Sequence, residues 1–275
     1  MSSAPAPTRS RKQARPSLTA IVVIAVVLIG GVVALMLARQ TTAPEPAVAA
    51  PTISVPPQAT SSAIETAGTT AEHALATRPM MQLPAQAAQP QAMTTASAGP
   101  AITVLTPTIS PGRWIPDGFP STPEGALGQL KTLNETVLTA ADPQVYARGF
   151  QELAEPGAPD PTSTGLSTLL TGLRSRAQLP ATGPIPGLSA TYRVTHGQIK
   201  GATSDGLYVV ACVLGQFSAG ANGRLVSAGV GDCQAMRWNG TRWLIASGSV
   251  AAPAPCAWPG SADAVKAGYR ELNGG

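Results

Sequence analysis

Residues 207–238 read LYVVACVLGQFSAGANGRLVSAGVGDCQAMRW, two long strand-like runs on either side of Asn222-Gly223. An Asn-Gly pair tolerates the positive φ angles of a two-residue turn, and between apolar runs it is the strongest short-range signal for a β-hairpin. This stretch therefore predicts a long antiparallel hairpin, and the rest of the domain is expected to be built around it.

The hairpin predicts a register for two cysteines. If Ala221 faces Arg224 across the turn, counting outward places Cys212 opposite Cys233 in a non-hydrogen-bonded pair, with Cα atoms about 4.5 Å apart. That spacing is at the short end of the range for a disulfide, which we expect in an oxidising compartment. The alternative is two buried thiols that only pack. Cys256 would be free, pair between chains, or replace one partner.

Further strands are expected at 190–199 and 241–249, because turn residues separate them from the hairpin. The sheet is then a four-stranded antiparallel meander. Apolar residues of four other segments recur at helical spacing, and some follow a cap residue and a proline. These helices are expected at about 123–138, 143–153, 164–177 and 261–272. The pattern of helices, then strands, then a helix predicts an α+β domain.

An apolar segment at 18–38 contains neither charge nor proline. As a helix it would be about 30 Å long, which matches the hydrocarbon thickness of a bilayer. Basic residues precede it and few follow, which favours a cytoplasmic N-terminus. The preceding residues are Arg9, Arg11, Lys12 and Arg15. We expect a single-pass plasma-membrane protein with an extracytoplasmic C-terminal domain; the alternative is a cleaved signal peptide, with Ala-Val-Ala at 47–49 as cleavage site.

Composition divides the rest of the chain. After the apolar segment, Ala, Pro, Thr, Ser and Gln dominate, and such a segment buries too little apolar surface to offset its ordering entropy. Aromatic and periodic apolar residues return at Arg113. We therefore expect a cytoplasmic basic tail (1–17), a transmembrane helix (18–38), a flexible extracytoplasmic linker (39–112) and an α+β domain (113–275).

The charge distribution argues against direct nucleic-acid binding. The formal net charge is +4, but five of the 18 basic residues flank the apolar segment, which leaves 13 against all 14 acidic residues. A nucleic-acid surface needs clustered basic residues, because affinity comes largely from neutralised phosphates. The basic N-terminus is explained by membrane topology and anionic headgroups.

Catalytic and metal-binding patterns are absent from the sequence. It contains no Gly-x-Ser-x-Gly, His-Glu-x-x-His, CxxC or phosphate-binding loop motif. We therefore assign no catalytic residue, cofactor or metal ligand and expect a protein that is not an enzyme. If the fold holds a pocket, its polar residues would be Tyr192, His196 and Asp232. The pair Gly229 and Gly231 is interpreted as a kink or bulge in a long strand.

Both faces of the strand 207–214 are apolar, which is unexpected for an antiparallel strand with one face in water. Helices can cover one face. The other would be covered by the C-terminal segment, a second copy of the chain or another protein, which makes this a candidate interaction strand. Its candidate contact residues are Leu207, Val209, Ala211 and Val213.

Several motifs carry a family resemblance. The segments 114–116 (WIP), 118–126 (GFPSTPEGA), 258–261 (WPGS) and 267–270 (AGYR) resemble membrane proteins of actinobacterial integrative conjugative elements. The hairpin 238–245 (WNGTRWLI) is similar to the final strands of the nuclear transport factor 2 superfamily (NTF2-like). The resemblance implies a cone-shaped domain with a curled sheet, although this superfamily hosts many functions.

The resemblance also implies a function. It indicates a non-enzymatic membrane scaffold of a conjugative DNA-transfer or type IV secretion apparatus, whose partners are other envelope proteins. Alternatives are an accessory subunit of an envelope lipid or solute transporter, and a small-molecule-binding NTF2-like domain. In the last case Tyr192, His196 and Asp232 would have to converge in an open cavity.

Overall fold

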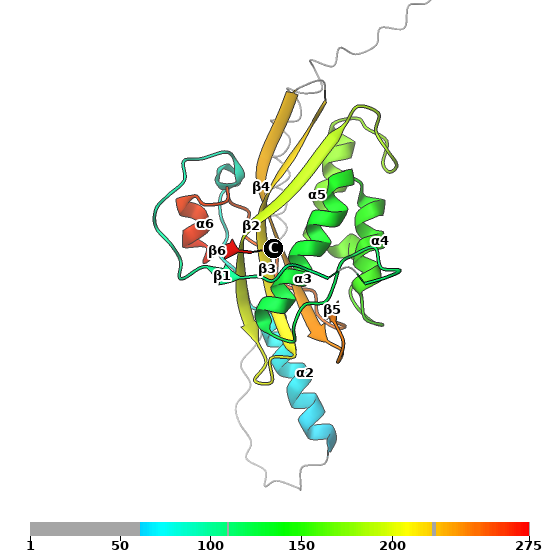
Figure 1. The fold of residues 1–275 in the computed structure, drawn as a ribbon, viewed down its shortest axis with the longest axis vertical. Coiled ribbons are helices and arrows are strands. Elements are labelled where there is room, and N and C mark those ends of the chain that lie inside the picture. The colour runs from blue at the N-terminus through cyan, green and yellow to red at the C-terminus, as the bar shows by residue number, and fades with distance from the viewer. Residues whose placement is uncertain (1–60, 109, 222–223, 275) are drawn as a thin grey trace, which may run out of the picture.

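The structure, a computed structural model, describes residues 61–108, 110–221 and 224–274. Within these ranges the chain has a mixed α+β fold in which helices cover both faces of a curled sheet (Figure 1). The expected membrane span at 18–38 and the Asn222-Gly223 turn lie outside the described residues. None of the helices inside those ranges combines the length and apolar character that crossing a bilayer requires.

The sheet has six strands in the order β1-β6-β2-β3-β4-β5. The expected meander is present, with antiparallel pairing between consecutive strands. Its strands are β2 (Ser189–Ala202), β3 (Tyr208–Ala221), β4 (Arg224–Trp238) and β5 (Trp243–Ile245). Two strands were not predicted. β6 (Arg270–Asn273) pairs antiparallel with β2 and parallel with β1 (Ile102–Thr103).

The C-terminal helix is shorter than predicted. Ser261 caps α6 (Ala262–Lys266) by accepting a hydrogen bond from the Ala264 backbone N–H, as its sequence position indicated. Gly268 then adopts a φ of 90°, which ends the helical path, and the chain continues as β6. The expectation of a helix through residue 272 was therefore wrong in its second half.

The register of the central hairpin is as predicted. Pairing between β3 and β4 runs without a shift from Ala221–Arg224 to Tyr208–Arg237 and places Cys212 opposite Cys233. The two form a disulfide with a Cα–Cα distance of 4.1 Å, so the predicted bridge is confirmed and Cys256 is free.

Gly229 and Gly231 do not form the expected kink or bulge, because the β3–β4 register continues through both. A Cβ on Gly229 would overlap the Ala257 carbonyl oxygen, and one on Gly231 would lie 2.5 Å from the Pro255 carbonyl oxygen. The glycines therefore let the segment 254–258 lie directly on the strand.

The first three of the predicted helices pack on one face of the sheet. Thr122 and Asp142 cap α3 and α4, each ahead of a proline, as the sequence indicated. Leucines and aromatic residues of these helices form the larger core with the facing side of β2, β3 and β4. The elements are α3 (Pro123–Val137), η2 (Leu138–Ala140), α4 (Pro143–Leu153), η3 (Pro161–Ser163) and α5 (Gly165–Arg176).

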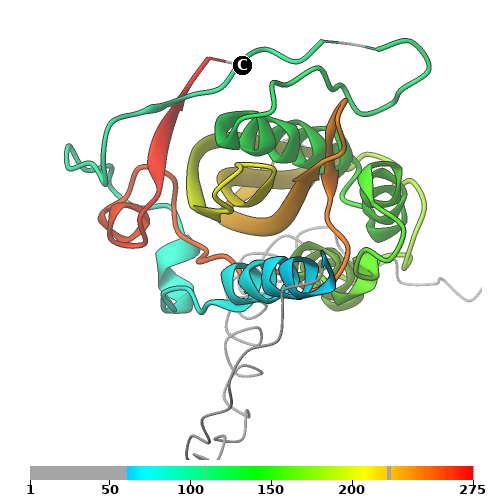
Figure 2. The same ribbon diagram turned by 90° about the horizontal axis from the view of Figure 1, so that it is seen from below.

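The second face is covered by α2 (Ser61–Thr77), η1 (Ala85–Ala88) and the C-terminal segment (Figure 2). Ala76 and Ala87 are buried there, since small side chains allow close approach to the sheet. The Lys200 ammonium donates a 2.8 Å hydrogen bond to the Ala76 carbonyl at the end of α2. Much of the predicted linker 39–112 is thus part of the folded domain, and residues 39–60 lie outside the described ranges.

Candidate functional site

Asp232 is the acidic side chain at the centre of the candidate site. It lies on β4 opposite Val213, on the face covered by α3, and is 5% exposed. Asn134 on α3 donates a 2.9 Å hydrogen bond to its Oδ2, and Gln234 donates a 3.0 Å bond to its Oδ1. Each carboxylate oxygen therefore has one amide partner and retains further acceptor capacity.

Burial raises the pKa of Asp232 to about 6, and the hydrogen bonds from Asn134 and Gln234 oppose that rise. No lysine, arginine or histidine among the described residues forms an ion pair with it. Burial and the Asp232 charge also raise the pKa values of surrounding groups, which stay neutral near pH 7. These groups are Tyr146, Tyr192, Tyr269 and Cys256.

A cavity of about 120 Å³ lies beside Asp232. Residues 230–234 of β4 all line it. Successive side chains of a strand point to opposite faces, so a cavity on one face would be lined by every second residue. The cavity therefore lies along the edge of the strand. η3 and α5 enclose it from one side and the segment 250–256 from the other. Its remaining walls are mostly apolar, and they include Leu166, Leu169, Val250, Ala251, Pro253 and Ala254.

The predicted pocket residues do not converge. Tyr192 lies on the same face as Asp232, but its hydroxyl donates a 2.8 Å hydrogen bond to the Val230 carbonyl and does not line the cavity. A register shift between Val194 and His196 turns the histidine to the opposite face. Of the three predicted residues, only Asp232 lines the cavity.

His196 has a different environment. It pairs with Leu214, which belongs to the core on the second face, and its ring approaches Gly260 ahead of α6. Its Nδ1 is 2.9 Å from the Thr195 hydroxyl. Burial lowers its pKa, and the Glu271 carboxylate opposes this effect.

Sequence reasoning missed two contributors to the site. Asn134 lies on the buried face of α3, between Leu130 and Leu138. A polar residue at such a position indicates a polar partner on the element packed against it. The Oδ1 of Asn134 has no hydrogen-bond partner among the described residues. Thr164 lines the cavity and caps α5, and its hydroxyl donates a 2.8 Å hydrogen bond to the Pro161 carbonyl. The Tyr146 hydroxyl has no hydrogen-bond partner among the described residues.

The candidate interaction strand is buried. Val209, Ala211 and Val213 have no exposed surface and pack under the helices, while Leu207 is 39% exposed at the strand's beginning. The opposite face is covered by α2 and the C-terminal segment, the first of the alternatives considered for it. The expectation of an interface along Leu207, Val209, Ala211 and Val213 was therefore wrong, because the segment 61–88 supplies cover that its composition did not indicate.

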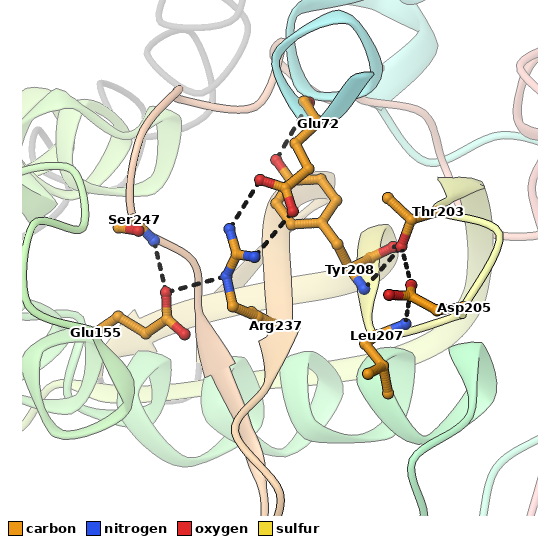
Figure 3. A network of polar contacts seen from close by, with 8 residues as sticks. All are labelled: Glu72, Glu155, Thr203, Asp205, Leu207, Tyr208, Arg237 and Ser247. Atoms are coloured by element: carbon orange, nitrogen blue, oxygen red, sulfur yellow. Dashed lines mark hydrogen bonds and ion pairs between the residues drawn. The ribbon is translucent and has the colours of Figure 1, made fainter. Parts of the chain in front are cut away.

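A second polar cluster joins α2 to the sheet (Figure 3). Arg237 on β4 donates two hydrogen bonds of 2.8 and 2.9 Å to the Glu72 carboxylate of α2, and its Nε is 3.3 Å from Glu155. Its guanidinium also lies over the Tyr208 ring. The guanidinium is paired with both carboxylates, so the cluster attaches α2 to the sheet and its cation is already occupied.

A more polar pocket of about 280 Å³ lies between α3, β2 and the residues at β6. Lys131 and Glu135 form a 2.8 Å ion pair there, and Glu135 accepts a hydrogen bond from the Val194 N–H. The charges of Lys131 and Glu135 thus bind one another, and Arg193 also lines the pocket. Across the part of the chain that the structure describes, no cluster of three His, Cys, Asp or Glu side chains is placed to hold a metal ion.

Comparison of the chain with protein-family models, with curated proteins and with solved structures finds no match.

Proposed function

We propose that this protein is a single-pass membrane scaffold of a conjugative DNA-transfer or secretion apparatus, and that its extracytoplasmic domain binds extended segments of other envelope proteins. The observation that carries the proposal is the free outer edge of β4. β5 pairs only with Met236–Trp238, and the segment 254–258 lies on the strand at Gly229 and Gly231, so residues 224–228 form the part of this edge that has neither a strand partner nor this cover within the described ranges.

The edge is chemically suited to strand addition. Because Ala221 and Arg224 form the pair that closes the hairpin, Leu225 and Ser227 direct their backbone N–H and C=O groups away from β3. The same alternation is seen further along, where Ala246 donates to the Ala235 carbonyl from the outer side. Such a row of backbone groups is complementary to another extended backbone.

Exposure along the edge supports a docking role. Leu225 is 61% exposed, and the hairpin extends past the helices at this end (Figure 1). The described part of β4 before Gly229 has neither proline nor lysine, the residues that commonly protect an edge from pairing. An edge of this kind is expected to have a partner in the assembled state.

The surroundings of Asp232 favour a binding role over a catalytic one. Asp232 faces neither a second carboxylate nor a histidine among the described residues, so the site lacks an acid and base pair. The curled sheet with helices on its inner face is compatible with a cone of the NTF2-like type. The resemblance of 113–272 to proteins of actinobacterial conjugative elements supplies the assignment to that apparatus.

Site-specific crosslinking tests the proposal. A photo-crosslinking residue at Leu225 of the full chain, in the native membrane, is expected to form adducts with an envelope protein of the transfer apparatus. The matched control position for the crosslinking residue is Leu105, which is 57% exposed and does not belong to this edge. Adducts at Leu225 with transporter subunits, equal adducts at both positions or none at Leu225 would overturn it.

A backbone variant tests strand addition itself. Leu225→Pro removes one outward N–H but no bond of the β3–β4 ladder, whereas Leu225→Ser removes only the side chain. We expect the proline variant to abolish the adducts formed from Ser227 and the serine variant to retain them. The reverse result would show a side-chain contact instead.

A further inference from the structure

The cavity beside Asp232 combines two properties that rarely occur together. Its walls are mostly apolar, and one of them carries a carboxylate that is 5% exposed and has no cationic partner among the described residues. Nothing in the proposed scaffold role uses this cavity.

A buried carboxylate without a cation is costly, since removal from water is not compensated by an opposite charge. The amide groups of Asn134 and Gln234 supply one hydrogen bond to each oxygen. Both oxygens can accept further bonds, and a positively charged donor would also supply the missing counter-charge. The electrostatics of the cavity therefore favour a cation over a neutral molecule.

The size of the cavity limits what can enter. Its volume of about 120 Å³ is comparable to apolar cavities of about 150 Å³ that bind benzene. Val250 lines the cavity and is 44% exposed, which places it at the mouth. The apolar walls from α5 and the segment 250–256 would surround a ring or a short branched chain.

We propose that this cavity binds a small primary amine with an apolar body of about the size of a benzene ring, its ammonium group directed at Asp232. The proposal is independent of the docking edge, because the ligand would lie behind the residues 230–234 and not along 224–228. Either can fail without the other.

The test uses the full chain in nanodiscs, with benzylamine as probe and benzyl alcohol and toluene as neutral isosteres, measured by calorimetry and ligand-observed NMR. At pH 7.5 we expect benzylamine to bind at least tenfold more tightly than benzyl alcohol. Equal affinities, or no binding of any probe, would overturn the proposal.

Two variants locate the ligand. Asp232→Asn is expected to weaken benzylamine binding at least tenfold and to leave benzyl alcohol unchanged, while Val250→Trp obstructs the mouth and weakens both. Asp263→Asn, on α6 and away from the cavity, is the matched control and should change neither. Unchanged benzylamine binding to Asp232→Asn would contradict the assignment.

The wild-type protein provides a test that needs no variant. Between pH 7.5 and 5 the preference for benzylamine over benzyl alcohol should fall about tenfold, because Asp232, with a pKa of about 6, is mostly protonated at pH 5. The groups facing it, Tyr146, Tyr192, Tyr269 and Cys256, stay neutral throughout. A preference that is unchanged at pH 5 would show that the ammonium does not face Asp232.

Discussion

Asn134 on α3 donates a 2.9 Å hydrogen bond to Asp232 on β4, and this bond joins a helix to a strand across the larger core. It only partly offsets the cost of burying the carboxylate, whose pKa rises from 3.8 to about 6. The native state therefore binds more protons than the unfolded state between these two values.

The contribution of Asp232 to stability should consequently increase as the pH falls through 6. The shift corresponds to roughly 3 kcal/mol, a penalty that is fully present above pH 6 and absent below about pH 4. Urea unfolding of the wild type and of Asp232→Asn at pH 7.5, 6 and 5 measures it. The free energy of unfolding of the wild type should rise relative to that of Asp232→Asn as the pH falls. A constant difference between the two would contradict the raised pKa of Asp232.

Removing the disulfide should destabilise the protein. Cys212 and Cys233 are 21 residues apart, and a crosslink closing a loop of this size contributes about 3 kcal/mol, mainly by restricting the unfolded chain. We expect the double variant Cys212→Ala, Cys233→Ala to lose about this amount in urea unfolding. Reductant should lower the stability of the wild type and of Cys256→Ala but leave the double variant unchanged.

Gly229→Ala should destabilise the protein strongly, although the substitution adds only one methyl group. The added Cβ would overlap the Ala257 backbone carbonyl, so strand or segment must move, at a cost of about 3 kcal/mol or more. Gly68→Ala in α2 is the control, since nothing lies within 4 Å of the added carbon. Thermal unfolding should show a lower midpoint for the first and an unchanged or higher midpoint for the second. Equal effects would contradict the close approach.

Arg237→Lys should loosen α2 without unfolding the domain. Lysine keeps the charge but loses the paired hydrogen bonds to Glu72, which we expect to cost about 1 kcal/mol because the arginine side chain is 32% exposed. Hydrogen exchange of the amides in residues 69–77 should accelerate about fivefold. Arg193→Lys, at an exposed position of β2, should leave that exchange unchanged, and a general acceleration would indicate global destabilisation instead.

The central hairpin could be predicted because a two-residue turn fixes every pair beyond it, and no bulge interrupts β3 and β4. The same reasoning failed for β2. Alternation continues through Tyr192, Val194 and His196 in the sequence, while the bulge at Thr195 reverses the faces after it. Whether a strand has a bulge depends on its neighbours, here α3 through Glu135 and the Val194 N–H.

The cover on the second face could not be predicted from composition. Ala76 and Ala87 are too small to produce a recognisable apolar pattern in the sequence. They pack on the second face because β3 presents a complementary apolar surface there. Asp232 could be singled out as the acid within the sheet, yet its amide partner Asn134 and its cavity depend on elements far apart in the chain. Local sequence does not specify such neighbours.

The position of β6 has a consequence for biosynthesis. Arg270–Asn273 lies between β1 and β2, so β1 is made early in translation and acquires its strand partner only when the last strand has been synthesised. A nascent chain that stops before Arg270 leaves β1 without its strand partner, while β2 keeps its pairing with β3. The sheet thus becomes complete only in a polypeptide whose translation has reached β6.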